Sequence, residues 1–392
     1  MRVMKAVQQN YNPTAEILHL FDEFRSMTND CIRIGMKEDI SSLKALSSRA
    51  YRELGRADAM SYYKICAISA AVGILRNYRK ALRKGQRPSP PYVRKLRVTT
   101  CLGFRITDDN LLLPVQPKRP VKIPLNKHTL EAISGYEPRS VTLTPHRLCI
   151  TFAKVAKEID PIGFMGIDRN LNNVTLADSG SEVQQIDLTK ATEIKSMYRN
   201  IKSKFHRNDI RIRRRISQKY GLKERAKVHQ ILNHASKLIV QEAKRKRYGI
   251  AMEEITNLRK LSRRGNGRGT RYRFVLNSWS YGELQRQIEY KARWEGLPVI
   301  YVKAYGTSAK CSMCGSRMTR IPEESRKLRC SGCGLTIDRD VNAARNILAR
   351  ALRFGAVGLP SEAVVQEPNA GSEAPKAILK VDGGQLTCPE TS

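Results

Sequence analysis

Residues 311–348 read CSMCGSRMTRIPEESRKLRCSGCGLTIDRDVNAARNIL and contain two Cys-x-x-Cys pairs with fifteen residues between them. Each pair presents two sulfurs on one side of a tight turn, and four thiolates complete the tetrahedral shell that Zn²⁺ prefers. A closed shell leaves no position for a substrate, so the sequence predicts a structural zinc ribbon. A redox-active dithiol is the alternative, but it requires only one pair. The predicted zinc ligands are Cys311, Cys314, Cys330 and Cys333.

Three acidic residues stand where they would meet at one site of an α/β fold. Asp168 ends the apolar run 164–167, Glu253 ends the run 249–252, and Asp340 precedes a helix-forming segment. Carboxylates gathered at the ends of buried strands are unfavourable unless a cation neutralises them. Mg²⁺ prefers such oxygen ligands, and two ions about 4 Å apart can activate water and stabilise the leaving oxygen of a phosphodiester. The sequence therefore predicts a two-ion Mg²⁺ site.

Each acid taken alone has a plainer explanation as a strand-end or helix-cap residue. Asp338 or Asp340, for example, would serve as an ordinary N-cap. The order of all three acids across matching elements favours the metal site instead. None of the six histidines lies near the cysteines, and no His-Glu-x-x-His motif is present, so histidine-based chemistry is not expected.

The charge of the chain indicates a polyanionic partner. Lys and Arg total 71 against 36 Asp and Glu, which gives a formal net charge of +35. An excess of this size favours nucleic acid over a merely solvated surface. The basic residues are densest in one helical stretch, and the candidates for nucleic-acid contact there are Arg199, Lys202, Lys204, Arg207, Arg211, Arg213, Arg214 and Arg215.

A membrane location is not expected. The first ten residues lack an apolar signal core, and the longest apolar run, 66–75, is about half the length of a spanning helix. The five cysteines outside the ribbon are scattered, which argues against a secreted disulfide framework. We therefore expect a soluble, intracellular protein.

Residues 1–159 combine sequence patterns typical of β-strands with patterns typical of α-helices. Residues 1–10 alternate like a strand, and 11–85 place apolar residues at helical spacings. Residues 86–159 break the helix with Pro and continue in short β-rich pieces. These features predict a β-barrel or sandwich of about five to seven strands, completed by the first strand, with the helical bundle as an insertion.

The second part predicts an RNase H-like α/β domain. From residue 160 a strand meander is followed by a helix, a strand, a second helix and another strand, which is the element order of that fold. A flexible Gly/Arg segment is expected at 263–273. The tail 355–392 mixes Pro, Gly and Glu without period and is expected to be loose.

Four segments together resemble the TnpB family of transposon-encoded RNA-guided DNA endonucleases, whose core compact type V CRISPR effectors share. They are GIDRNLNNVTLADSG at 166–180, IAMEEITNL at 250–258, WSYGELQRQIEYKARWEGLPVIYV at 279–302, and the cysteine segment. The resemblance is specific from about Gly163 to Leu352 and only architectural before that. It places the RuvC-like catalytic and metal-binding triad on Asp168, Glu253 and Asp340.

The resemblance also implies a domain organisation. Residues 1–10 and 86–159 would form a β-barrel wedge domain, and 11–85 its inserted helical recognition lobe. A RuvC-like nuclease domain would comprise 160–306 and 336–354, with the zinc ribbon at 307–335 as a target-nucleic-acid-binding insertion. The implied partners are a guide RNA and double-stranded DNA next to a short motif, and the oligomeric state stays open.

Two departures from the family pattern concern the triad. Arg169-Asn170 stands where the family often has Leu-Gly, and Glu253-Glu254 replaces a common Glu-Asp. Only one of two adjacent glutamates on a strand can face the site, so the choice between them is left open.

Three other functions compete with the transposon-encoded endonuclease. A compact type V CRISPR effector would use the same chemistry. A guided repressor or structural RNA-binding protein would not need the three intact acids. A DNA-strand transposase or junction resolvase is compatible with the acids alone, but the large N-terminal half and the zinc ribbon disfavour it.

Overall fold

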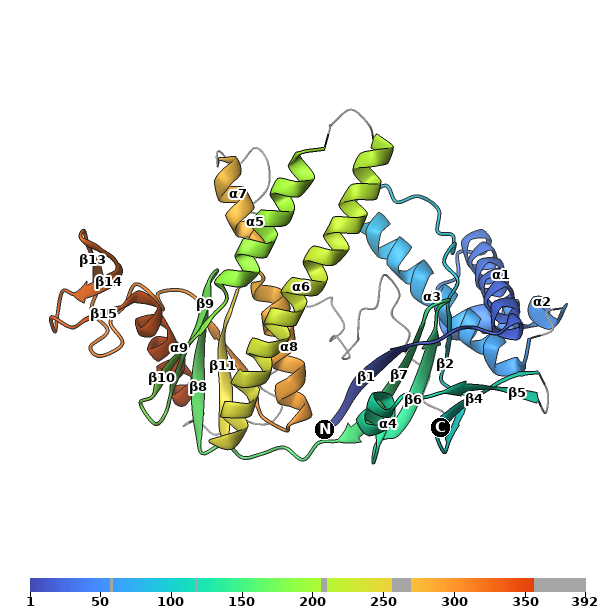
Figure 1. Cartoon of the computed structure of the whole chain (residues 1–392), viewed down its shortest axis with the longest axis horizontal. Coiled ribbons are helices and arrows are strands. Elements are labelled where there is room, and N and C mark those ends of the chain that lie inside the picture. Colours follow the sequence, from blue (N-terminus) through green and yellow to red (C-terminus); the bar gives the residue numbers. More distant parts are fainter. Residues whose placement is uncertain (57–58, 117–118, 206–209, 256–268, 356–392) are drawn as a thin grey trace. The chain divides into compact units, whose positions relative to one another are not determined.

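The computed structural model describes residues 1–56, 59–116, 119–205, 210–255 and 269–355 of the 392-residue chain (Figure 1). These residues fall into two compact units. One runs from Arg2 to Val155, and the other comprises Met1 and the residues from Ala156 onward. Within the described ranges, no helix combines the length and the apolar character needed to cross a membrane.

The strands of the N-terminal unit form two sheets. The first has the order β1-β7-β6-β2 and the second the order β3-β4-β5. The first strand pairs antiparallel with β7 over its whole length, as expected. Because the described strands pair in two separate sheets, the closed barrel stays a prediction. The strands are β1 (Arg2–Asn10), β2 (Val98–Thr100), β3 (Arg105–Thr107), β4 (Asn110–Gln116), β5 (Arg119–Pro124), β6 (Glu137–Leu143) and β7 (Arg147–Val155).

The helices of this unit lie mainly between β1 and β2 in the chain. In the first of them, apolar residues recur every three or four positions, and Phe21 and Phe24 are buried where this helix packs on the third. The predicted helical insertion is therefore present. A short helix that the sequence did not predict lies between β5 and β6. The elements are α1 (Ala15–Lys37), α2 (Leu43–Glu53), a 3₁₀ turn (Leu54–Arg56), α3 (Ser61–Arg83) and α4 (Lys127–Ile133).

The second unit is built on a five-stranded sheet of order β10-β9-β8-β11-β12. The first three strands form an antiparallel meander, and β11 pairs in parallel with both β8 and β12. This topology confirms the predicted element order. The strands are β8 (Gly163–Arg169), β9 (Asn173–Asp178), β10 (Val183–Asp187), β11 (Tyr248–Glu254) and β12 (Val299–Lys303).

Helices cover both faces of this sheet (Figure 1). On one face α5 (Thr189–Ser203), α6 (Ile210–Arg245) and α8 (Tyr281–Trp294) enclose the larger core. On the other face α9 (Arg339–Gly355) packs on β8, β9, β11 and β12. The contact with β8 is close, because a Cβ on Gly166 would lie 2.4 Å from the backbone oxygen of Ala344 in α9. Only glycine permits this approach.

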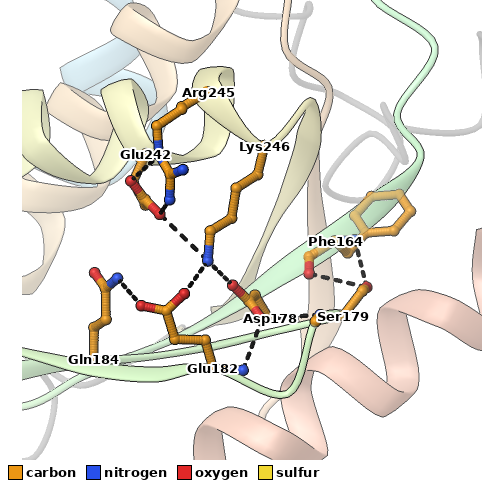
Figure 2. A network of polar contacts seen from close by, with 9 residues as sticks. Phe164, Asp178, Ser179, Glu182, Gln184, Glu242, Arg245 and Lys246 are labelled. Atoms are coloured by element: carbon orange, nitrogen blue, oxygen red, sulfur yellow. Dashed lines mark hydrogen bonds and ion pairs between the residues drawn. The ribbon is translucent and has the colours of Figure 1, made fainter.

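An ion-pair cluster ties the end of α6 to the meander (Figure 2). Lys246 donates to the buried carboxylate of Asp178 and to Glu182, and Glu242 lies 3.3 Å from the same ammonium group. Hydrogen bonds to Asp178 and Glu182 raise the pKa of Lys246. Lys246 lies two residues before the start of β11, and Asp178 ends β9 beside the start of β8. The cluster therefore joins α6 to the end of the sheet where β8 and β11 begin, and Asp168 and Glu253 lie at the other end of these strands.

The remaining described elements are one further helix and the strands of the zinc ribbon. A helix at α7 (Thr270–Ser278) begins inside the predicted Gly/Arg segment, so its last residues are helical rather than flexible, while 256–268 lie outside the described residues. The ribbon is a three-stranded antiparallel sheet. Its third strand extends three residues beyond the predicted limit of 335 and leads directly into α9. The strands are β13 (Met318–Ile321), β14 (Glu324–Cys330) and β15 (Thr336–Asp338). The tail from 356 lies outside the described residues.

Candidate active site and zinc ribbon

The carboxylates of Asp168 and Glu253 belong to the sheet face that α9 covers. Side chains alternate along a strand, and Phe164 and Ala251 lie in the core beneath α9. Asp168 and Glu253 follow these two residues at even spacing on paired parallel strands. Glu254 falls on the opposite face and is exposed. The geometry thus selects Glu253 from the two adjacent glutamates.

Asp340 reaches the same place from α9, where it is 1% exposed. The capping of this helix is done by its neighbour, because Asp338 Oδ1 accepts hydrogen bonds from the backbone N–H of Asp340 at 2.8 Å and of Val341 at 3.2 Å. The N-cap role therefore belongs to Asp338, and the carboxylate of Asp340 serves another purpose.

The charge of Asp168 is unfavourable in this environment. Burial, followed by the negative charges of Glu253 and Asp340, raises the pKa of Asp168 to about 7, although a hydrogen bond from Asn170 opposes the shift. Both other acids contribute to this shift, so they lie within electrostatic reach of Asp168. A bound cation would remove this penalty, which is the chemistry expected of a Mg²⁺ site.

This pKa leads to a prediction about stability in the presence of a chelator. An acid whose pKa is raised by folding loses stability as the pH rises from its unfolded pKa, about 4, to its folded pKa, about 7. Asp168→Asn is uncharged at all pH values, so we expect it to be more stable than wild type at pH 8 by roughly 1 to 3 kcal/mol. The difference should shrink towards pH 5. Urea unfolding in EDTA at both values measures it.

The exposed acid Asp160 provides the control for this measurement. Asp160→Asn should change the unfolding free energy little at either pH. An Asp168→Asn protein that is less stable than wild type at pH 8 would contradict the proposed electrostatic strain.

Several polar residues that the sequence did not single out hold the three acids in position. Asn170 donates from Nδ2 to Asp168 Oδ2 at 2.8 Å, and Asn173 donates from Nδ2 to Asp340 Oδ2 at 3.4 Å. Both asparagines belong to the tight turn between β8 and β9. The hydroxyl of Thr307 donates to Glu253 Oε1. A turn sequence rich in asparagine was visible, but its contact with α9 depends on the tertiary fold.

Two arginines supply positive charge to Asp340. The guanidinium of Arg326, on β14 of the ribbon, pairs with Asp340 and lies 3.6 Å from Asp338. Arg339 contacts Asp340 Oδ1 at 3.2 Å. Among the described residues, the three carboxylates do not form a tightly convergent metal-binding group, which is consistent with Asp340 being turned towards these arginines. Arg326 therefore links the ribbon physically to the acid site.

Arg169, one of the departures from the family pattern, is accommodated on the other face of the sheet. Its Nη1 donates to Gln285 Oε1 of α8 at 2.6 Å, and its Nη2 donates to the backbone oxygen of Glu253. Burial lowers the pKa of Arg169. This buried guanidinium connects β8, β11 and α8, so the departure leaves Asp168 free on its own face.

The four ribbon cysteines are brought together as expected. Their sulfur atoms all lie within 4.8 Å of one another. The Cys311–Cys333 separation of 3.7 Å matches the spacing of about 3.8 Å between sulfurs of a tetrahedral site with Zn–S bonds of about 2.3 Å. Backbone N–H groups of Met313 and Gly332 point at Cys311 and Cys330 at 3.4 and 3.3 Å. The geometry fits a zinc ion bound by four thiolates.

The described residues among the predicted nucleic-acid contacts divide into two groups. Arg199 lies with its guanidinium 4.0 Å from the ring centre of Phe274, and Lys202 pairs with Glu224 at 2.7 Å, so both are engaged within the protein. Arg207 lies outside the described residues. The others are exposed along α6 or at the end of α5, and they are Lys204, Arg211, Arg213, Arg214 and Arg215.

Comparisons with known proteins identify a matching family domain and several similar proteins. The family described as "Cas12f1-like, TNB domain" matches residues 281–347. The chain is 28% identical over 280 residues to the TnpB-like protein MJ0751 of Methanocaldococcus jannaschii, covering 67% of this chain and 98% of that protein. It is 37% identical over 117 residues to the CRISPR-associated endodeoxyribonuclease Cas12f1 of Sulfoacidibacillus thermotolerans, covering 29% of this chain and 25% of that protein.

The solved structures agree with the sequence relatives. A cryo-EM structure of a Cas12f1–sgRNA–target DNA complex superposes with a TM-score of 0.55 at 16% identity, covering 85% of this chain and 83% of that chain. The fold is thus similar to that of the compact Cas12 effectors. Its TnpB-like relatives and the matching ribbon domain thus make the chain similar to proteins of the TnpB family.

Proposed function

We propose that this protein is an RNA-guided DNA endonuclease of a mobile element, which uses a transposon-derived guide RNA to cut double-stranded DNA beside a short motif. The observation that carries the proposal is the burial of Asp168 within electrostatic reach of Glu253 and Asp340, which disfavours its charge without a cation. The names of the relatives, a TnpB-like protein and a CRISPR-associated endodeoxyribonuclease, support it.

Asp168, Glu253 and Asp340 would hold Mg²⁺, which, when bound, activates water and stabilises the leaving oxygen of a phosphodiester. Asn170 and Asn173 orient the first and last of these acids, and Thr307 orients Glu253. Arg326 is already within reach of Asp340, so its guanidinium is placed to contact the phosphate of a substrate strand.

The exposed arginines at the start of α6 would bind the guide RNA and its heteroduplex. Phosphate contacts of this kind position a nucleic acid without reading its sequence. Base pairing between guide and target would then select the site, as in other RNA-guided systems. The large positive charge is explained by this role better than by a site that touches only a few phosphates.

The alternative functions differ in the residues and the guide RNA that they require. A cleavage-dead repressor would tolerate loss of an acid, whereas all three are present and oriented by hydrogen bonds. A compact CRISPR effector would have the same chemistry with a guide from another source. A transposase or resolvase would act without RNA, which the following experiment tests.

Protein produced in cells should carry a long RNA that survives moderate salt. After removal of that RNA, we expect no site-specific cutting of duplex DNA with Mg²⁺, because base pairing supplies the specificity. Adding the RNA back should restore cutting at sites that match its guide segment. Sequencing of the copurified RNA and mapping of the cut sites measure both effects. Efficient site-specific cutting by RNA-free protein would reject the guided mechanism.

Arginine variants provide the control for this experiment. Arg213→Gln should reduce the salt dependence of RNA binding by up to about one unit in the slope of log K against log salt. Lys202→Gln should reduce it less, because Glu224 already pairs with Lys202. Replacing Arg211, Arg213, Arg214 and Arg215 together should weaken RNA retention without changing which base sequence is cut.

A further inference from the structure

A cavity of about 240 Å³ adjoins the acid site. One wall consists of Val275 and Leu276 of α7 and of Trp279, which follows directly after that helix. The opposite rim contains Arg326 and Arg339, beside Asp340. The cavity thus combines an apolar aromatic wall with two guanidinium groups at the place where we expect the scissile phosphate.

The residues that line this cavity offer more kinds of contact than a phosphate group alone would need. Phosphate is recognised by charge and N–H donors, whereas an aromatic wall matches the flat face of a base. The turn between β8 and β9 adds amide groups, including that of Asn172, at the edge of the same cavity. The lining thus offers contacts for the face of a base, for its edge and for the adjoining phosphate. A base within a duplex is stacked on both sides, so the occupant must be unpaired.

Trp279 also has a buried polar atom. Its indole Nε1 is buried, and within the described part of the chain it has no hydrogen-bond partner. Buried donors in native proteins are almost always satisfied by protein, water or ligand.

The position of Trp279 is fixed by α5. Lys195 Nζ donates to the backbone oxygen of Ser278 and to Ser280 Oγ, both at 2.5 Å, so the residues on either side of Trp279 are anchored. Arg199 adds a second contact, since its guanidinium lies over Phe274 of α7. A side chain held in this way loses little freedom on binding, which favours it as a stacking platform.

We propose that this cavity binds the base of one unpaired DNA nucleotide beside the bond that is cut. The base stacks on Trp279, and the adjoining phosphate contacts Arg326 and Arg339. The proposal rests on the proposed function, of which it specifies the substrate form at the acid site. Because every base has a face that can stack, this contact selects single-stranded character rather than base sequence.

The test combines variants of the protein with abasic nucleotides in the substrate. Duplex targets with a single abasic nucleotide at successive positions around the cut are offered to the complex of full-length protein and guide RNA. We expect wild type to cut about five- to a hundredfold more slowly at one position only, the loss typical of one stacked base. Trp279→Ala should cut the intact target more slowly by a similar factor and lose the response to that abasic position.

Two further variants separate stacking from folding. Trp279→Phe keeps an aromatic ring and should retain both the rate and the abasic response to a large extent. Tyr290→Ala removes a half-exposed aromatic residue of α8 outside the cavity and should leave both unchanged. Absence of any position-specific abasic effect, or an effect that persists unchanged in Trp279→Ala, would overturn the proposal.

A binding experiment separates this proposal from the proposed function. A single-stranded oligodeoxynucleotide carrying 5-iodouracil is irradiated with the full-length protein in EDTA, and the crosslinked peptides are identified by mass spectrometry. Crosslinking at Trp279 supports the base site even where the RNA-loaded protein cuts no DNA, a result that would remove only the proposed function. Crosslinks found exclusively on other peptides would overturn the base site.

Discussion

Replacing Asp340 by alanine should reduce DNA cutting by at least about a thousandfold, which corresponds to roughly 4 kcal/mol of transition-state stabilisation. Asp168→Ala and Glu253→Ala should have similar effects, because each removes a proposed ligand of the Mg²⁺ ions. Binding of guide RNA and target DNA should change little, since the basic helices remain. Single-turnover cleavage and equilibrium binding measure the two effects separately.

Neighbouring acids provide matched controls for this prediction. Glu254→Ala removes an exposed carboxylate one position from Glu253 but on the other face of β11, so it should keep most of the activity. Asp338→Asn retains an oxygen that can cap α9 and should also remain active. Retained cutting by Glu253→Ala together with loss in Glu254→Ala would show that the geometric assignment is wrong.

Cys311→Ser should lower the zinc affinity of the ribbon by more than about a hundredfold, because the thiolate is a direct ligand and zinc binding stabilises such small modules. Cutting should fall as well. The ribbon carries Arg326, which pairs with Asp340, and its last strand ends in Asp338, which caps α9. Elemental analysis after dialysis and cleavage rates measure the two losses.

Cys149→Ser is the corresponding control. Cys149 lies on β7 in the N-terminal unit, and its replacement should leave about one zinc per chain. Full zinc content in Cys311→Ser would contradict a site of four thiolates. Loss of zinc with full cutting activity would contradict the dependence of the acid site on the ribbon.

Local sequence patterns predicted the parts of this site that depend on local chemistry. Asp168 and Glu253 follow short apolar runs, which mark buried strands and their ends. The cysteine spacing predicted the ribbon because four ligands must surround one ion. Asp340 became a candidate because it precedes a helix-forming segment. Only the hydrogen bonds that Asp338 accepts at the start of α9 show that Asp338, and not Asp340, caps this helix.

Residues that act through tertiary contacts could not be predicted in this way. Arg326 is one of many arginines, and only the pairing of β14 with β15 brings it to Asp340. Arg199 was predicted to contact nucleic acid, yet it packs on Phe274, which is distant in sequence. β5 contains two prolines and resembles a loop, but it lies at the edge of its sheet, where missing N–H donors are tolerated.

The hydrogen bond between Asn173 and Asp340 joins residues 167 positions apart. Closing a loop of this length costs conformational entropy, which the packing of α9 on the sheet must offset. The meander and β11 contain only two of the three acids, and α9, at the C-terminal end of the described residues, contains the third. A chain cut short before α9 would therefore retain the strands of the sheet but lack one of the three candidate metal ligands.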